Sequence, residues 1–167
     1  MGKHFLITAI TIITLLSSCN PAPEAEKTQS IDSRSYNLGI IGGFSELVDV
    51  GVKKLALSET QTPEEMNAMM ADAEKIAERN HVQLYREKDL VVTWLFPADV
   101  AKGKDVLLIY KGNTKDEYLA LKEEMKVLEK EGKYNDEQKM HISIRFGQML
   151  SYPQWKIDEL ISKNNIP

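Results

Sequence analysis

Asp105-Val106-Leu107-Leu108-Ile109-Tyr110 is the stretch of this 167-residue chain that decides its fold. It is a short apolar run that includes β-branched and aromatic residues, and it follows the turn sequence Lys102-Gly103-Lys104. A run of this length, bounded by a turn, is typical of a β-strand. The sequence therefore predicts a sheet that contains residues 105–110, and the flanking stretches are interpreted around it.

Two further strands are predicted just before this one. Residues 82–86 and 90–96 are rich in strand-forming residues, and Glu87-Lys88-Asp89 lies between them. This spacing predicts a hairpin with a tight turn. Pro97 follows the second run and is expected to end it, because proline has no backbone N–H to donate to a strand ladder.

The start of the folded region has the pattern of a βαβ unit. Residues 36–41 are predicted to form a strand that ends at Gly42-Gly43. Residues 44–50 are predicted to form a short helix closed by Gly51, and residues 52–58 a second strand. Strand, helix and strand in this order favour two parallel strands joined by a crossover.

Residues 62–80 give the clearest helix signature in the sequence. Thr62 and Glu65 have the spacing of a capping box, and Pro63 suits the first helical position. Asn80 is expected to end the helix.

Three methionines, Met66, Met69 and Met70, fall on one face of this predicted helix. Thioether sulfur is a soft ligand that suits copper. Methionine is also an ordinary filler of helix–sheet interfaces. Because alanines and Ile76 continue the same face, core packing is the favoured interpretation.

The remainder of the chain is predicted to be helical. Thr114 and Glu117 have capping-box spacing at the start of a long helix that Gly132 ends. Asn135 begins another helix, and Pro153 opens a last short one. The expected fold class is α/β: a mixed sheet of about five strands, with early βαβ units, a hairpin and a C-terminal layer of helices.

The N-terminus carries the sequence Leu16-Ser17-Ser18-Cys19 directly after the uncharged apolar run 5–16. This run is shorter than the roughly 20 apolar residues of a membrane-spanning helix, and it has the form of a secretory signal. The tetrapeptide resembles the lipobox of bacterial lipoproteins. The resemblance implies cleavage before Cys19, acylation of its thiol and attachment to a membrane outside the cytoplasm, with Asn20 favouring the outer over the inner membrane. A plain signal peptide with a chance cysteine, or an uncleaved anchor, is the alternative.

Three segments follow from this interpretation: a signal peptide over 1–18, a lipidated cysteine with a flexible tether over 19–35, and a single α/β domain over 36–167. The tether contains two prolines and almost no apolar residues. Since Cys19 is the only cysteine, the domain has neither a disulfide framework nor a thiolate metal site. The chain is acidic, with a formal net charge of −4, which argues against nucleic acid as a partner.

Candidate ligand-binding residues are sought at the strand ends, because open α/β sheets bind ligands beyond the carboxyl ends of their strands. The predicted topology places six residues on one rim there: Gly42, Gly43, Ser58, Glu59, Tyr110 and Lys111. Ordinary turn and cap chemistry is the simpler interpretation of the same residues.

His141 and Arg145 lie four residues apart and are predicted to share a helix face. They would bind an anionic group together, or pair with acidic neighbours across a helix interface, and the second option is favoured. Trp94 is a candidate for a pocket wall or for the core. No zinc-binding motif is present in the sequence, and neither a metal nor a cofactor is expected.

Together these features favour a lipid-anchored envelope protein that presents a ligand-binding or partner-binding domain to the periplasm. Its expected partners are the membrane, through the acyl chains, and a small ligand or another envelope protein. The main alternative is a small enzyme with its site at the strand ends. A partner-docking subunit with an exposed apolar patch on its C-terminal helices is the third hypothesis.

Overall fold

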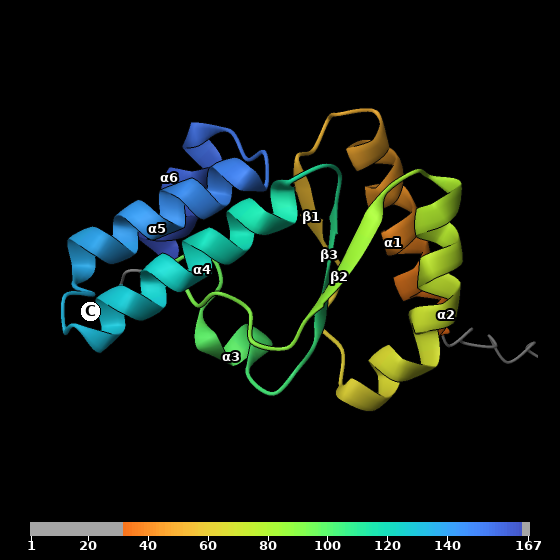
Figure 1. Ribbon diagram of the computed structural model, residues 1–167, viewed down its shortest axis with the longest axis horizontal. Helices are drawn as coiled ribbons and strands as arrows, with labels where there is room; N and C mark the ends of the chain where they lie inside the picture. The colour runs from red at the N-terminus through yellow and green to blue at the C-terminus, as the bar shows by residue number, and fades with distance from the viewer. Residues whose placement is uncertain (1–31, 165–167) are drawn as a thin grey trace, which may run out of the picture. The chain divides into compact units, whose positions relative to one another are not determined.

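The computed structural model describes residues 32–164, which form six helices and one three-stranded sheet (Figure 1). Residues 1–31 and 165–167, and with them Cys19 and the predicted signal peptide, lie outside the described residues. In chain order the elements are α1 (Ser33–Asp49), β1 (Leu55–Leu57), α2 (Pro63–Arg79), β2 (Gln83–Glu87), α3 (Ala98–Ala101), β3 (Val106–Tyr110), α4 (Thr114–Lys130), α5 (Asp136–Met149) and α6 (Gln154–Asn164).

The sheet has the strand order β1-β3-β2, and both pairings are antiparallel. Leu55 pairs with Tyr110 in one ladder, and Gln83 pairs with the same residue in the other. The predicted fold class α/β is confirmed, whereas about five strands and a parallel βαβ unit are wrong for residues 32–164. The stretch that was expected to decide the fold is the central strand of this sheet.

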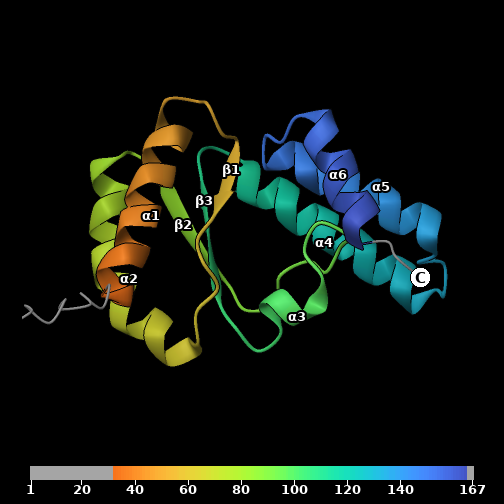
Figure 2. The ribbon, with the colours of Figure 1, turned by 180° about the vertical axis from the view of Figure 1, so that it is seen from behind.

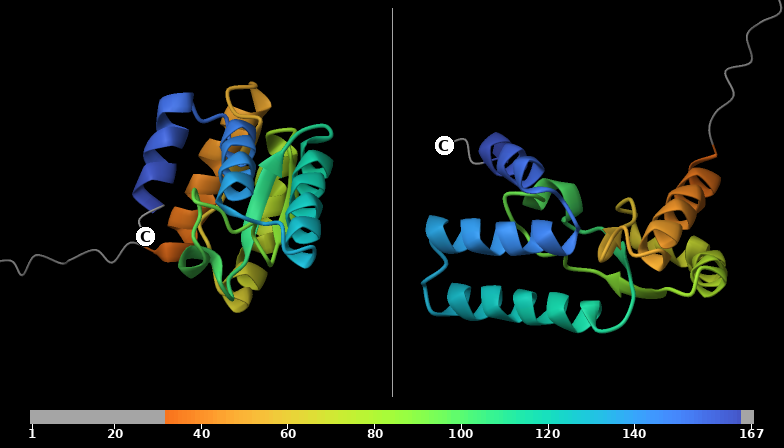
Figure 3. Two further views of the ribbon diagram at one scale, coloured as in Figure 1. Left: turned by 90° about the vertical axis from the view of Figure 1, so that its left-hand side faces the viewer. Right: turned by 90° about the horizontal axis from the view of Figure 1, so that it is seen from above.

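Helices cover both faces of the sheet (Figures 1 and 2). Helices α1 and α2 pack on one face, while α4, α5 and α6 form a layer on the other side. Helices α4 and α5 lie side by side in this layer, as the view from above makes clear (Figure 3). The result is three layers, with a hydrophobic core on each side of the sheet.

Strand β3 joins these two cores because its side chains alternate between them. Leu107 and Ile109 point to the α1/α2 side, and Val106, Leu108 and Tyr110 point to the α4/α5 side. All five are buried, as the central position of the strand requires. The continuous apolar run over residues 106–110 is therefore explained by burial on both faces.

The predicted strand over 36–41 and the glycine turn after it are wrong, because residues 33–49 form the continuous helix α1. Asp32 caps it by accepting hydrogen bonds from the amides of Arg34 and Ser35. Ile41 and Val48, seven residues apart, are both buried against α2 and the sheet. Each glycine in the middle of a helix costs roughly 0.5–1 kcal/mol relative to alanine. The burial of apolar side chains at helical spacing outweighs this cost. The helix also takes in residues 33–35, which were assigned to the tether.

The predicted strand over 90–96 is also wrong: this stretch is an irregular loop whose backbone groups bond to side chains instead of a neighbouring strand. The amide of Val91 donates to the hydroxyl of Tyr118 at 3.3 Å, and that of Trp94 donates to Ser143 Oγ at 3.1 Å. The hydroxyl of Thr93 accepts from the amides two and three residues on. Tyr118 lies on α4 and Ser143 on α5, so the local pattern did not reveal the bonds that they accept.

Several helix boundaries follow the prediction. Thr62 and Glu65 form both hydrogen bonds of the capping box at α2, and Asn135 accepts from the amide of Gln138 at α5. Gly51 follows the C-cap of α1, where its φ of +79° favours glycine. The second predicted capping box is wrong: Asn113 is the N-cap of α4 and makes no side-chain cap bond.

Candidate functional site

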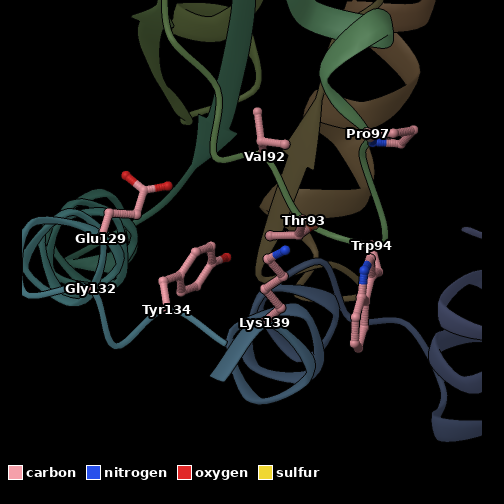
Figure 4. A pocket seen from close by; sticks show the side chains of 8 residues that line it. All are labelled: Val92, Thr93, Trp94, Pro97, Glu129, Gly132, Tyr134 and Lys139. Atoms are coloured by element: carbon pink, nitrogen blue, oxygen red, sulfur yellow. The ribbon is translucent and has the colours of Figure 1, made fainter. Parts of the chain in front are cut away.

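A cleft of about 560 Å³ opens between the 92–97 loop and the facing ends of α4 and α5 (Figure 4). Its volume lies in the range of small-molecule sites. It is lined by Val92, Thr93, Trp94, Pro97, Glu129, Gly132, Tyr134 and Lys139. Apolar and aromatic walls with a few polar groups are the usual composition of a ligand-binding site.

The hydroxyl of Tyr134 is the most informative atom in this cleft. It is buried, and no other atom among residues 32–164 hydrogen-bonds to it. Burial and the Glu129 carboxylate together raise the pKa of Tyr134 to about 12, so the hydroxyl keeps its proton at neutral pH. A buried donor without a partner is uncommon in folded proteins, so this hydroxyl is an unused hydrogen-bonding group in a residue that lines the cleft.

Charges of opposite sign stand on the two helices that border the cleft. Glu129 belongs to α4, Lys139 belongs to α5, and the ring of Tyr134 lies between them (Figure 4). The Lys139 ammonium is 5.9 Å from the centroid of that ring, within cation–π range. Its nearest carboxylate contact, 3.9 Å from Asp136, is a loose surface pair. The cleft therefore offers both an anionic and a cationic group to a ligand.

Trp94 forms the wall opposite Tyr134, and it is held there through its backbone (Figure 4). Its amide donates to Ser143 on α5, and its carbonyl accepts from the side-chain amide of Asn164 on α6. Ser143 is fully buried and donates in turn to the carbonyl of Lys139. The loop is thus fixed to two helices, and the indole is left partly exposed to the cleft.

A buried ionic cluster fixes the other end of the same loop. The Lys122 ammonium lies 3.0 Å from Glu87 Oε1 and also donates to the carbonyl of Asp89. The side chain of Lys122 is 11% exposed and that of Glu87 is 4% exposed, so both charges are largely out of water. Burial and the neighbouring Glu87 carboxylate raise the pKa of Tyr118. Glu87 Oε1 accepts from the Lys122 ammonium and from the Asp89 amide, whereas Glu87 Oε2 has no hydrogen-bond partner among residues 32–164. Because these bonds tie β2, α4 and the loop backbone together, we assign this cluster a structural role.

The six residues of the predicted rim are not brought together, because antiparallel strands place their carboxyl ends at opposite ends of the sheet. Gly42 and Gly43 lie within helix α1. Tyr110 is buried beside the start of β1, and Lys111 pairs with Asp49 at 2.7 Å.

Ser58 and Glu59 lie beyond the other end of β1 and line a different cavity. The hydroxyl of Ser58 is already used twice: it accepts from the Leu107 amide and donates to the Glu59 carbonyl. The hypothesis of an enzyme site at the strand ends depended on these six residues lying together, and they do not.

His141 and Arg145 were expected to pair with acidic neighbours across a helix interface, and Arg145 does so. Arg145 is bonded across the helix interface to Glu124 at 2.6 Å, so its charge is already paired. His141 lies beside a separate shallow depression that Glu124 also lines. Met66 and Met69 are buried in the core, which supports packing over copper binding, and Met70 packs against that core.

Sequence reasoning named Trp94 as a candidate pocket wall and missed the other cleft residues. Tyr134 lies in the short connection between α4 and α5, which carries no recognisable motif. A tyrosine next to a helix-ending glycine is unremarkable in a sequence, so only the packing of α4 against α5 reveals it.

Comparison with known protein families, curated proteins and solved structures finds no match to this chain. No group of three or more acidic, histidine or cysteine side chains within residues 32–164 is arranged to hold a metal ion. Among the helices of that same range, none has the length and apolar character needed to cross a membrane.

Proposed function

We propose that this chain is a lipid-anchored protein of the bacterial envelope whose folded domain binds a small ligand between Trp94 and Tyr134. The sequence Leu16-Ser17-Ser18-Cys19 supports the anchor. The observation that carries the binding function is the buried, unpartnered Tyr134 hydroxyl in an aromatic-walled cleft.

The walls of the cleft indicate the chemistry of the ligand. Trp94 and Tyr134 provide apolar ring surface, which suits a ligand with an aromatic or aliphatic group. Lys139 and Glu129 provide one cation and one anion, so a ligand of a single sign would meet one repulsive group. A small zwitterion with an apolar side chain, such as a free amino acid, satisfies the rings and both charges.

The anchor and the binding function are tested separately. The intact mass of the chain, extracted gently from membranes of its own host, is expected to match residues 19–167 plus acyl groups. An uncleaved or unacylated mass would overturn the anchor and leave the binding proposal standing. Any non-covalent mass carried by the native protein would identify the ligand directly.

Binding is tested by tryptophan fluorescence in the Trp155→Phe background, where Trp94 is the sole remaining tryptophan. Trp155 lies on α6 and is 67% exposed, so its replacement should leave the cleft intact. L-phenylalanine should give a saturable change in fluorescence. Its dissociation constant should be at least about tenfold lower than that of phenylacetate or phenethylamine, which each lack one charge. Equal affinities for the three probes, or no binding of any of them, would contradict the proposal that the ligand is a zwitterion.

The contribution of the hydroxyl is isolated by Tyr134→Phe, which keeps the ring and removes the oxygen. This change should weaken binding of L-phenylalanine roughly tenfold, the value of a hydrogen bond to a charged group. Met140→Ala, on an exposed α5 residue that does not line the cleft, is the matched control and should bind normally.

A further inference from the structure

A second cavity, of about 220 Å³, lies along the free edge of strand β1. It contains none of the cleft residues and is bounded instead by α1, α3 and the turn between α5 and α6. Its lining is mainly apolar and includes Phe44, Leu57, Leu90, Phe96, Val106 and Leu150. Its volume falls below the usual range for drug-sized ligands, so it suits a small apolar group.

Lys53 is the cationic side chain of this cavity. Its ammonium donates to the carbonyl of Leu150 at 2.7 Å and lies 5.0 Å from the centroid of the Tyr152 ring. No carboxylate among residues 32–164 lies within 4.0 Å of it, whereas the neighbouring Lys54 pairs with Glu117. An ammonium has three donors, and the Leu150 carbonyl occupies only one of them.

The position of Lys53 makes its missing counter-ion significant. Burial lowers the pKa of this lysine, which means that the site partly withholds water from the charge. A charge in such surroundings gains more from an anionic partner than an exposed lysine would. Acidic Glu59 lies six residues further along the same edge, up to about 20 Å away in extended chain, so the two ends of the cavity differ in charge.

We propose that this cavity binds a short aliphatic carboxylate, with the carboxylate on Lys53 and the chain against Phe96 and Leu57. The apolar lining takes the aliphatic chain, and Lys53 supplies the two free donors for the head group. Glu59 repels a carboxylate at the far end, which fixes the direction of the ligand. This site is independent of the Trp94–Tyr134 cleft, and neither proposal depends on the other.

The test uses the full chain carrying Cys19→Ser, so that no acyl group on residue 19 competes for the cavity. Calorimetric titration with octanoate should give saturable binding, and 1-octanol, which lacks the charge, should bind at least about tenfold more weakly. Hexanoate should also bind more weakly, by up to about fourfold for each methylene removed. Two-dimensional NMR should locate the octanoate-dependent shifts at Phe96, Leu57 and Tyr152.

Three variants separate a specific site from general apolar binding. Lys53→Gln should lose the preference for octanoate over 1-octanol, and Lys53→Arg should largely keep it. Lys54→Gln removes an exposed neighbouring charge and should behave as the parent. Equal binding of octanoate by the parent and Lys53→Gln, the same loss in Lys54→Gln, or no saturable binding by the parent would each overturn the proposal.

Discussion

Two helical glycines of this protein differ in their effect on stability, although the residue type is the same. Gly147 on α5 lies against Ile157 and Leu95, and an added Cβ there would come within 2.7 Å of Ile157 Cγ1 and 2.9 Å of Leu95 Cδ2. Gly43 on α1 has no atom within 4 Å of the same position. One glycine permits close packing between helices, and the other is only a weak point in a helix.

These two glycines make a matched pair of substitutions. Gly147→Ala should lower the free energy of unfolding by about 1–3 kcal/mol, because the methyl group overpacks a buried interface. Gly43→Ala should raise it by roughly 0.5–1 kcal/mol, because alanine favours the helix and meets no neighbour. Urea denaturation measures both, and a stabilising Gly147→Ala would contradict the packing described here.

At the scale of elements, α2 and α4 begin differently although both were predicted to carry capping boxes. The Thr62 hydroxyl accepts from the Glu65 amide at 3.2 Å, and the Glu65 carboxylate accepts from the Thr62 amide at 2.9 Å. At α4 the hydroxyl of Thr114 instead donates to the carbonyl of Lys111. The same spacing therefore caps one helix and closes a turn before the other.

The difference predicts unequal costs for removing the two N-cap side chains. Thr62→Ala should destabilise the domain by about 1 kcal/mol, because the amide of Glu65 loses its acceptor. Asn113→Ala at α4 should change stability by no more than about 0.5 kcal/mol, since that side chain makes no cap bond. Thermal unfolding followed by circular dichroism checks both, and equal losses would argue against the assigned caps.

At the scale of the whole molecule, the sheet, the cleft loop and α4 are joined by one buried ionic cluster. Glu87 comes from β2 and Lys122 from α4, and the Lys122 ammonium also donates to the carbonyl of Asp89 in the loop that leads to Trp94. Breaking a buried pair leaves an uncompensated charge, which costs more than the pair itself contributes. The cluster therefore couples the stability of the domain to the shape of the cleft.

Lys122→Met should accordingly destabilise the protein by about 3–5 kcal/mol and loosen the loop that carries Trp94. Adding Glu87→Gln should recover part of this loss, because the lone buried carboxylate is then removed. The control is Lys126→Met, one turn further along α4, where an exposed lysine lies 3.8 Å from Asp89. It should cost at most about 1 kcal/mol. Additive losses in the Lys122/Glu87 double-mutant cycle would contradict the coupling.

The amino-acid sequence by itself determined the elements whose stabilising contacts are local. Residues 106–110 form a strand within the predicted range 105–110, α2 begins at its capping box and stops at Asn80, and Gly51 and Gly132 follow helix ends with positive φ. In each case the deciding interaction involves residues a few positions apart, so a pattern in the sequence reveals it. Trp94 was recognised as a candidate pocket wall for its residue type alone.

The tertiary structure alone decided the elements whose partners are distant in sequence. Residues 36–41 look like a strand by composition and become helical because α2 and the sheet bury one face of α1. Residues 90–96 have strand-forming composition, but Tyr118, Ser143 and Asn164 take their backbone hydrogen bonds. The antiparallel strand order and the cleft at Tyr134 likewise depend on contacts between separate elements, and long-range packing overrides local propensity where the two disagree.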